Sequence, residues 1–248
     1  MSRRPKDTAS INWNGFTGDK AIFPVCMRSP SVRGSSLTAQ LDAAAQRIDK
    51  MVIMMCDSLD RHNALGIDNA TQYCIDLADT WLETNYSEFK DRFQSVEVLR
   101  WEDDIRSHPT FQARLNAVMS LGETEPEYMA MRDAMSNYYL DSKKRRFETD
   151  RKRGLATHFD SEAAFNSSKD YLEEEFAGDM VYHELTGGIP NVYWGLYVDD
   201  FNIFERLSGD KDLAFPDTLA VKTQRYGRSV TASDLLRKSA FDKKPKVA

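Results

Sequence analysis

Hydrophobic and polar residues follow one another in the N-terminal part of the chain in an order that predicts a strand, a helix and a second strand. The run AIFPVCM (residues 21–27) is short, continuously apolar and followed by Ser, Pro and Gly, which is typical of a buried strand that ends in a loop. Ser36 can then cap a helix whose apolar residues recur at helical spacing up to Ile48. The apolar run MVIMMC (residues 51–56) follows and ends at Asp57. This order predicts the β-α-β unit of a parallel sheet.

Strand and helix patterns continue to alternate through the rest of the chain. Further helices are predicted at residues 68–93, at 110–153 with a break at Gly122, at 162–184 and around Asp234. Further strands are predicted at 95–101, at 192–198, where Tyr193, Gly195 and Tyr197 would share one face, and at 219–227. We therefore predict an α/β fold with a Rossmann-like, mostly parallel sheet flanked by helices.

The length and composition favour one compact domain. A chain of 248 residues can bury a core large enough for a pocket, and its 41% hydrophobic and 29% charged residues are the proportions of an ordinary globular protein. We expect a tail or strap at residues 1–19, a single catalytic domain at 20–238 and a basic tail at 239–248. We also expect a monomer.

The charge of the chain limits how it could contact nucleic acid. A formal net charge of −6 argues against a protein whose whole surface binds RNA or DNA, so any such contact would be local. Two basic stretches stand out, at residues 143–153 and in the tail with Lys243, Lys244 and Lys246. They either supply a local contact or are solvated surface.

Several classes of site are disfavoured by the motifs the chain lacks. Cys26, Cys56 and Cys74 are odd in number and lack metal-site spacing, which predicts reduced thiols in a cytoplasmic protein. No apolar run approaches the length of a membrane span, and the signatures of dinucleotide, P-loop and zinc-protease sites are absent, so we predict no membrane contact, no metal and no cofactor. The motifs with which class I aminoacyl-tRNA synthetases hold ATP are also absent. An aminoacyl substrate would therefore have to arrive already activated as an ester.

A phenol and a carboxylate lie one turn apart on the last long predicted helix. Tyr171 and Glu175 are four positions apart, so both project from the same helix face, where together they could hold an ammonium group. Leu172, Phe176 and Met180 form the neighbouring apolar stripe, which would seat the helix on the sheet. The alternative is an amphipathic helix with an exposed acidic edge.

Short segments along most of the chain carry a family resemblance. They are AIFPVCM, AAAQRI and MVIMMCD in the N-terminal half, then ETEPEYMAM, YLEEEFAGDM and LYVDDFNIFERL, and Asp57 follows Cys26 by 31 positions. These segments and this spacing resemble the tRNA-dependent cyclodipeptide synthases. The resemblance implies a fold similar to the catalytic domain of class I aminoacyl-tRNA synthetases.

The resemblance also implies an active site. It assigns the nucleophile to Cys26, the binding of the first substrate amino group to Tyr171 and Glu175, and the final proton transfers to Tyr197. We predict further substrate-binding roles for Tyr128, Ser29, Asp57, Tyr193 and Asp200.

The chain departs from the family at the nucleophile. The family has a serine in the context G-x-S-x-x-N, and Pro24, Cys26 and Ser29 occupy the corresponding positions here. A cysteine can perform the same step through a thioester, because the thiolate is a strong nucleophile. The alternatives are that Cys26 is a small buried hydrophobic residue, or that Ser29 or Ser31 attacks instead.

The chain also departs from the basic helix with which the bacterial family members grip tRNA. The corresponding helix is acidic here, with Asp76 and Asp79 among its residues, so we predict a tRNA surface elsewhere. That predicted tRNA-binding surface comprises Lys143, Lys144, Arg145, Arg146, Arg151, Lys152 and Arg153.

Acidic residues near the predicted pocket fit a cationic aminoacyl group. They are Glu174, Glu175, Asp199 and Asp200. The family includes a fungal branch that makes arginine-containing cyclodipeptides, which this chain resembles in that respect. Arginyl-tRNA is therefore a candidate partner.

Together these patterns favour a tRNA-dependent cyclodipeptide synthase. Such an aminoacyltransferase takes two aminoacyl-tRNAs per cycle and joins their aminoacyl groups into a diketopiperazine through an aminoacyl-enzyme. Two alternatives stay open. One is a Rossmann-like acyl transferase or hydrolase that acts on a small ester or thioester without tRNA, and the other is a non-catalytic RNA-binding protein.

Overall fold

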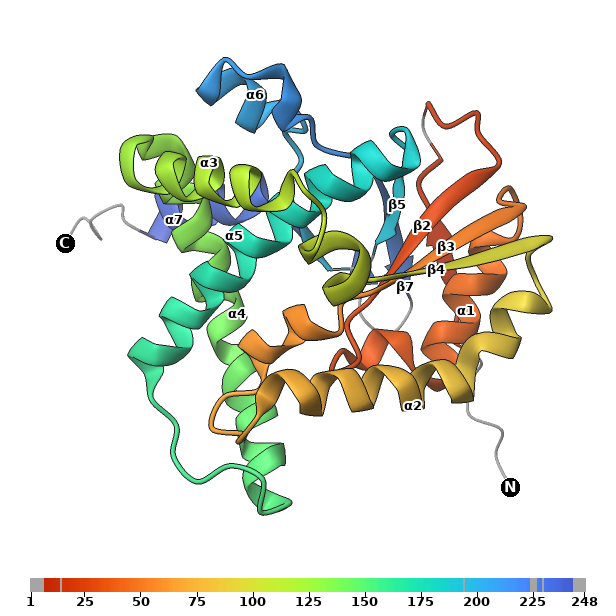
Figure 1. The fold of residues 1–248 in the computed structure, drawn as a ribbon, viewed down its shortest axis with the longest axis horizontal. Helices are drawn as coiled ribbons and strands as arrows, with labels where there is room; N and C mark the ends of the chain where they lie inside the picture. Colours follow the sequence, from red (N-terminus) through yellow and green to blue (C-terminus); the bar gives the residue numbers. More distant parts are fainter. Residues whose placement is uncertain (1–6, 14, 194, 224–226, 229, 243–248) are drawn as a thin grey trace.

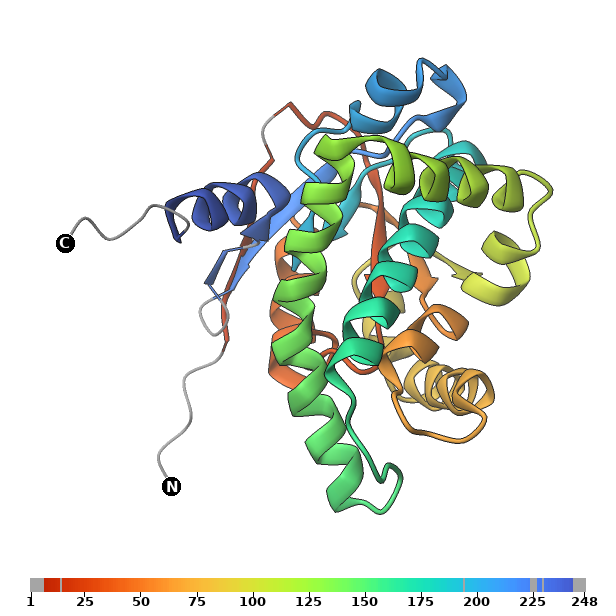
Figure 2. The same ribbon diagram turned by 90° about the vertical axis from the view of Figure 1, so that its left-hand side faces the viewer.

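A mostly parallel sheet forms the centre of the molecule and helices cover both of its faces (Figures 1 and 2). The computed structural model describes residues 7–13, 15–193, 195–223, 227–228 and 230–242. Neighbouring strands follow the order β1-β7-β5-β2-β3-β4 across the sheet, and β8 pairs with β7. Their bounds are β1 (Ala9–Ile11), β2 (Lys20–Val25), β3 (Lys50–Met55), β4 (Ser95–Arg100), β5 (Asn191–Tyr193), β7 (Thr218–Thr223) and β8 (Gly227–Arg228). The strands from β7 to β4 are parallel, whereas β1 and β8 pair antiparallel with β7.

The remaining elements connect these strands. A separate pair of short parallel strands consists of β6 (Leu196–Tyr197) and β9 (Val230–Thr231). The main helices are α1 (Gly34–Ala44), α2 (Ala70–Lys90), α3 (Phe111–Thr124), α4 (Pro126–Lys152), α5 (Ser161–Thr186), α6 (Ile203–Ser208) and α7 (Ala232–Asp242). Short helical segments are η1 (Pro30–Val32), η2 (Ser58–Asn63), η3 (Trp101–Arg106) and η4 (Lys211–Leu213).

Alternate residues of the central strands enter two different cores. Val52 and Met54 of β3 pack in the core that contains α3, α4 and α5, whereas Ile53 and Met55 pack in the core with α1 and α2. This is the consequence of side chains alternating across a strand whose two faces are both covered. The predicted Rossmann-like, mostly parallel sheet flanked by helices is confirmed.

Two predicted boundaries are wrong. The long helix at 110–153 breaks at Glu125, because that residue is extended and precedes Pro126, which opens α4. Gly122, where we expected the break, lies inside α3. The strand expected at 192–198 is divided into β5 and β6, and Gly195 between them has a φ of 147°, a backbone conformation that L side chains rarely adopt.

The ends of the chain extend the sheet and the helical layer. The predicted tail or strap at residues 1–19 contains β1, an edge strand, while residues 1–6 lie outside the described part. Within the predicted basic tail, α7 continues to Asp242, and the contact with nucleic acid considered for Lys243, Lys244 and Lys246 falls outside the described residues. None of the described helices is both long and apolar enough to cross a membrane.

Candidate active site

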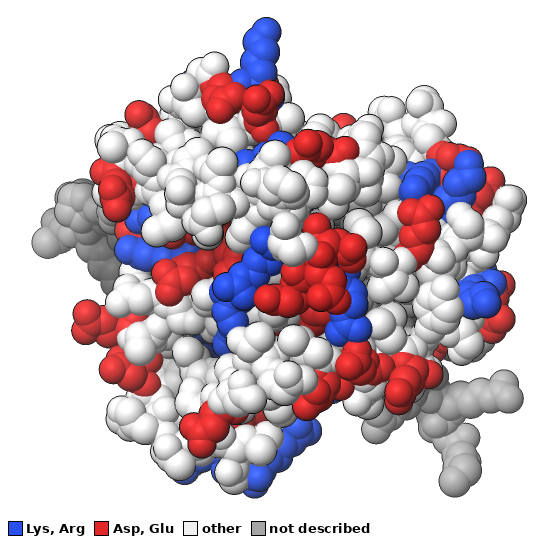
Figure 3. Space-filling view, viewed as in Figure 1, with Lys and Arg blue, Asp and Glu red and all other residues white. Residues whose placement is uncertain are grey.

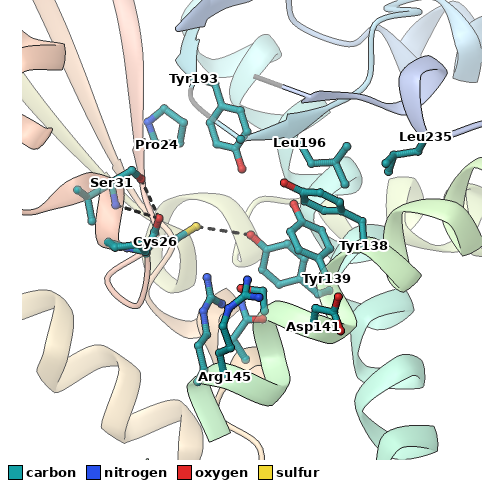
Figure 4. A pocket seen from close by; sticks show the side chains of 18 of the residues that line it. Pro24, Cys26, Ser31, Tyr138, Tyr139, Asp141, Arg145, Tyr193, Leu196 and Leu235 are labelled. Carbon is teal, nitrogen blue, oxygen red and sulfur yellow. Dashed lines mark hydrogen bonds between the residues drawn. The ribbon is translucent and has the colours of Figure 1, made fainter. Parts of the chain in front are cut away.

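A cavity of about 970 Å³ opens where β2 and β5 end, between the sheet and helices α4 and α5. Such crevices at the carboxyl ends of parallel strands are the usual ligand sites of open α/β sheets. Cys26 and Ser29 line it from the segment after β2, Tyr171 from α5, and Tyr193 from the end of β5. Figure 4 shows Tyr193 and Tyr139 pointing into this space near Cys26.

A series of hydrogen bonds runs from the Cys26 thiol through Tyr171, both of which line the cavity, to the carboxyl group of Glu175 behind Tyr171. Cys26 Sγ lies 3.5 Å from the hydroxyl of Tyr171, the contact drawn as a dashed line from the Cys26 sulfur in Figure 4. The same hydroxyl donates to Glu175 Oε1 at 2.9 Å. Because the phenol proton is directed at Glu175, the Tyr171 oxygen is left to accept the thiol proton of Cys26. The predicted pairing of Tyr171 and Glu175 on one helix face is confirmed, and the adjacent Leu172, which is fully buried, belongs to the core under α5.

Desolvation controls the protonation of Glu175 and Tyr171 in this series of hydrogen bonds. It raises the pKa of Glu175 to about 7, an effect that the hydrogen bond from Tyr171 opposes and the nearby charge of Asp60 reinforces. Desolvation, together with the charges of Cys26 and Glu175, holds the pKa of Tyr171 well above its usual value. Glu175 can therefore both take up and release a proton near neutral pH, as a general base or acid requires.

A second thiol lies beside the first. Cys26 directly follows β2 and Cys56 directly follows β3, and because Val25 pairs with Met55, the two cysteines come opposite each other on the same face of the sheet. A hydrogen bond with Cys26, and then burial, raise the pKa of Cys56 well above its usual value. Cys56 is therefore a protonated neighbour of the candidate nucleophile.

Sequence analysis missed the contribution of α4 to this cavity. Tyr139 stacks edge-on against Tyr171 at 5.8 Å between ring centroids, and its hydroxyl hydrogen-bonds with Tyr193. Desolvation, with the charges of Glu175 and Cys26, raises the pKa of Tyr139. The residues of α4 that line the cavity fall on one helix face, in groups three or four positions apart: Ala134, Asn137, Tyr138, Tyr139, Asp141, Ser142, Arg145 and Arg146. That helical spacing was the available signal.

Two of the predicted substrate-binding residues, Tyr128 and Asp57, lie outside the cavity, and those predictions need correction. Tyr128 is fully buried in the core, where it packs edge-on against Phe204. Asp57 is 1% exposed and accepts hydrogen bonds from the backbone of Ser58 and from Arg100 of β4.

Asp200 and Tyr197 also fall outside the main cavity. Asp200 lies at the surface and forms an ion pair with Arg206 at 2.7 Å. Tyr197 lines a second, smaller cavity that also contacts Glu175. Tyr193 lines both cavities, whereas Tyr197, which follows the break between β5 and β6, lines only the smaller one.

The predicted tRNA-binding residues divide into three groups. Lys143 is 2% exposed and donates to the carbonyl of His62, and burial lowers its pKa to about 7, so its assignment to the tRNA surface is wrong. Arg145 and Arg146 line the main cavity. The remaining members, Lys144, Arg151, Lys152 and Arg153, are exposed, and Arg151 is paired with Glu148.

Most of the acidic residues singled out for a cationic substrate are already occupied. Burial opposes the ionisation of Glu174, yet hydrogen bonds from His62 and Arg61 lower its pKa to about 2. Asp199 accepts a hydrogen bond from Ser233. Acidic and basic side chains are likewise interspersed over the face in Figure 3. Of the four acidic residues, Glu175 is the one that contacts the Cys26 site.

Comparison with known proteins identifies the fold. No protein-family model matches the chain, and no curated protein matches it in sequence. A structure of a cyclodipeptide synthase from Fluoribacter dumoffii superposes with a TM-score of 0.69 at 19% identity, over 88% of this chain and 98% of that one. A cyclodipeptide synthase from Candidatus Glomeribacter gigasporarum, bound to Phe-tRNAPhe, superposes with a TM-score of 0.57 at 18% identity, over 84% and 87%.

A third solved structure supports the same conclusion. A cyclodipeptide synthase from Bacillus thermoamylovorans superposes with a TM-score of 0.55 at 10% identity, over 83% of this chain and 88% of that one. Each of these superpositions covers at least 83% of both proteins. The chain therefore has the fold of the cyclodipeptide synthases.

Proposed function

We propose that this chain is a tRNA-dependent cyclodipeptide synthase, an aminoacyltransferase that joins two aminoacyl groups into a diketopiperazine. The observation that carries the proposal is the series of hydrogen bonds from Cys26 through Tyr171 to Glu175, whose first two members line a large cavity in a cyclodipeptide synthase fold. A nucleophile, a phenol and a carboxyl group with a pKa of about 7 form a set suited to acyl transfer.

The first step transfers an aminoacyl group to sulfur. Cys26 Sγ attacks the ester carbon of an aminoacyl-tRNA, so that a thioester bond forms as the bond between that carbon and the ribose oxygen breaks. The thiol proton passes through the Tyr171 hydroxyl toward Glu175 and is returned to the departing ribose oxygen. Tyr171 and Glu175 then hold the α-amino group of the bound aminoacyl group.

The later steps form two amide bonds. Glu175 takes a proton from the bound α-ammonium, and the free amine attacks the ester of a second aminoacyl-tRNA, which releases the second tRNA and leaves a dipeptide on Cys26. The terminal amine of the dipeptide then attacks the thioester carbon, and the carbon–sulfur bond breaks as the ring closes. Tyr139 and Tyr193 line the cavity beside this reaction, and Tyr197 keeps its predicted role in the last proton transfers.

The tRNA would approach along α4. Arg145 and Arg146 line the cavity and could neutralise phosphates near the acceptor end without reading bases. The structural relative from Candidatus Glomeribacter gigasporarum was solved with Phe-tRNAPhe bound. On that basis we propose aminoacyl-tRNAs as substrates of this chain. Arginyl-tRNA is proposed as one of them, because Glu175 accepts a hydrogen bond from Tyr171 and forms no ion pair with a described Lys or Arg.

The test is product formation by the purified chain. Incubation with a mixture of charged tRNAs should yield a cyclic dipeptide detectable by mass spectrometry, and Cys26→Ala should abolish it. Pretreatment of the charged tRNA with RNase should also abolish it, which distinguishes this function from a transferase that uses small esters. A product that survives RNase would overturn the proposal.

A further inference from the structure

Two thiols meet at the carboxyl ends of neighbouring strands. Cys26 follows β2 and Cys56 follows β3, and the backbone N–H of Cys56 donates to the carbonyl of Val25 at 3.0 Å, so the strand pairing continues up to the two cysteines. Cys56 belongs to the core that contains α3, α4 and α5, and Cys26 packs against the same core. Both side chains therefore lie on one face of the sheet, as direct neighbours.

The spacing of the two cysteines suits a disulfide. Neighbouring strands lie about 4.8 Å apart. Disulfides join residues whose Cα atoms are about 4.4 to 6.8 Å apart, so no large movement of the backbone is needed to bridge the pair. The two side chains are already linked by a hydrogen bond, and the other contact of Cys56 Sγ is a weak one, to the carbonyl of Met54 at 3.9 Å. The Cys56 sulfur is therefore free to turn toward Cys26.

The two thiols differ in their access to solutes. Cys26 is partly buried and lines the cavity of about 970 Å³, where Figure 4 shows its sulfur facing Tyr171. Cys56 is 2% exposed and is not among the described residues that line either cavity. A small oxidant that enters the main cavity therefore meets Cys26 first, and Cys56 lies behind it.

We propose that Cys26 and Cys56 form a reversible oxidation site for hydroperoxides, in which Cys26 is oxidised first and Cys56 then closes a disulfide with it. The site depends on the two thiols alone and does not rest on the proposed acyl transfer. While the disulfide is present, the Cys26 sulfur cannot attack any other group. Reduction of the disulfide returns the chain to its starting state.

Hydrogen peroxide supplies the oxidising equivalents. The Cys26 sulfur attacks one peroxide oxygen, the O–O bond breaks, and the thiol proton, which can leave through Tyr171, ends on the departing hydroxide as water. Cys26 is then a sulfenic acid. Cys56 Sγ attacks the Cys26 sulfur, the S–O bond breaks, and the departing hydroxide takes the Cys56 proton to form a second water. Two electrons have passed from the two sulfurs to the peroxide.

Cys56 also limits the damage that an oxidant can cause. A sulfenic acid that finds no thiol partner is oxidised further to a sulfinic acid, which ordinary reductants do not reverse. The third cysteine cannot replace Cys56 in this task. Cys74 is fully buried on α2, outside the described lining of both cavities, and burial raises its pKa to about 12.

The test uses the full chain, first reduced and then treated with a small excess of hydrogen peroxide. The intact mass should fall by about 2 Da through the loss of two hydrogen atoms. Peptide mapping should then find Cys26 joined to Cys56, with Cys74 still free. Dithiothreitol should restore both the mass and the labelling of Cys26 by iodoacetamide.

Two variants separate the roles of the cysteines. Cys56→Ala should gain about 32 Da at Cys26, the two oxygens of a sulfinic acid, and dithiothreitol should not remove them. Cys74→Ala is the matched control and should form the Cys26–Cys56 disulfide as the wild-type chain does. Circular dichroism before the peroxide is added checks that both variants are folded, and the peptide map of the wild-type chain needs no variant.

Three results would overturn the inference. The first is a peroxide-treated wild-type chain in which Cys26 is a sulfinic acid while Cys56 is a free thiol. The second is a disulfide that joins Cys26 to Cys74 or to a second copy of the chain. The third is a folded Cys56→Ala chain whose Cys26 recovers with dithiothreitol as fully as in wild type. Failure of the proposed function would look different, because the disulfide would form although no cyclic dipeptide is made from charged tRNA.

Discussion

Tyr171 has two roles, since its hydroxyl contacts both the Cys26 sulfur and the Glu175 carboxyl group. Tyr171→Phe removes this hydroxyl and leaves the ring packed, so we expect the turnover rate to fall about 100-fold or more with little loss of stability. Cyclic dipeptide formation measured with charged tRNA checks this expectation. Tyr86→Phe, a change on α2 away from the cavity, is the matched control, and equal rates for the two variants would contradict the role of Tyr171.

Glu175 makes the stability of the chain depend on pH. Desolvation raises its pKa from 4.5 to about 7, so the folded chain keeps a proton that the unfolded chain has released. The free energy of unfolding should therefore fall as pH rises from about 4.5 to 7, by on the order of 3 kcal/mol from this group. Asp179, whose pKa burial also raises, adds to the decline.

Urea unfolding at pH 5 and pH 7.5 measures this effect. Glu175→Gln should show a smaller decline between the two values than the wild-type chain. Glu174, whose pKa is lowered to about 2, makes the free energy of unfolding rise with pH, but only below about pH 4.5. Lys143, whose pKa is lowered to about 7, makes it rise with pH only above about pH 7. Equal declines in the wild-type and Glu175→Gln chains would contradict the raised pKa of Glu175.

The sequence identified some site residues because their signal is local. Tyr171 and Glu175 are neighbours on a helix whose spacing is visible in the chain, and Cys26 ends a recognisable buried strand. Asp57 was misplaced because Arg100, on the adjacent strand β4, occupies its carboxylate, and that pairing spans 43 positions. Tyr128 was misplaced because the packing of α4 against α5 decides which tyrosine reaches the cavity.

Helix α5 is the element on which the site depends, and a glycine sets how closely it approaches η3. A methyl group at Gly178 would meet the indole ring of Trp101, whose Nε1 donates to Glu174 at 3.1 Å. Gly178→Ala should therefore lower the free energy of unfolding by about 1 to 3 kcal/mol, measured by urea unfolding. Combining it with Trp101→Phe, which shortens the ring, should recover part of the loss. A Gly178→Ala chain as stable as wild type would contradict this packing.

Helix α4 presents two basic residues to the cavity and buries a third. Arg145→Ala combined with Arg146→Ala should weaken tRNA binding and reduce the salt dependence of the affinity by about 0.7 to 0.9 per lost phosphate contact. Lys143→Met, which retains the buried length of the side chain, should leave both quantities unchanged. Filter binding at several salt concentrations measures them, and a loss confined to Lys143→Met would contradict the assignment.

Across the whole molecule, the sequence predicted the central parallel strands and the helices that cover them, but it did not predict the edge of the sheet. The β-α-β unit from β2 to β3 and the covering helices follow from apolar periodicity, which each segment carries by itself. The antiparallel edge strand β1 could not be predicted, because its pairing joins Ile11 to Val221 across nearly the entire chain. The smaller cavity could not be predicted from the sequence either, since its lining comes from elements far apart in the chain, among them β5, β6 and α5.

The proposed reaction requires that Cys26 carries an aminoacyl group between its two halves. Intact-protein mass spectrometry, performed seconds after the chain is mixed with charged tRNA, would detect this aminoacyl-enzyme. We predict one aminoacyl adduct, mapped to Cys26 by peptide fragmentation, removed by neutral hydroxylamine as expected of a thioester, and absent from Cys26→Ala. An adduct that persists in Cys26→Ala, or the absence of any adduct in a chain that makes product, would contradict the account.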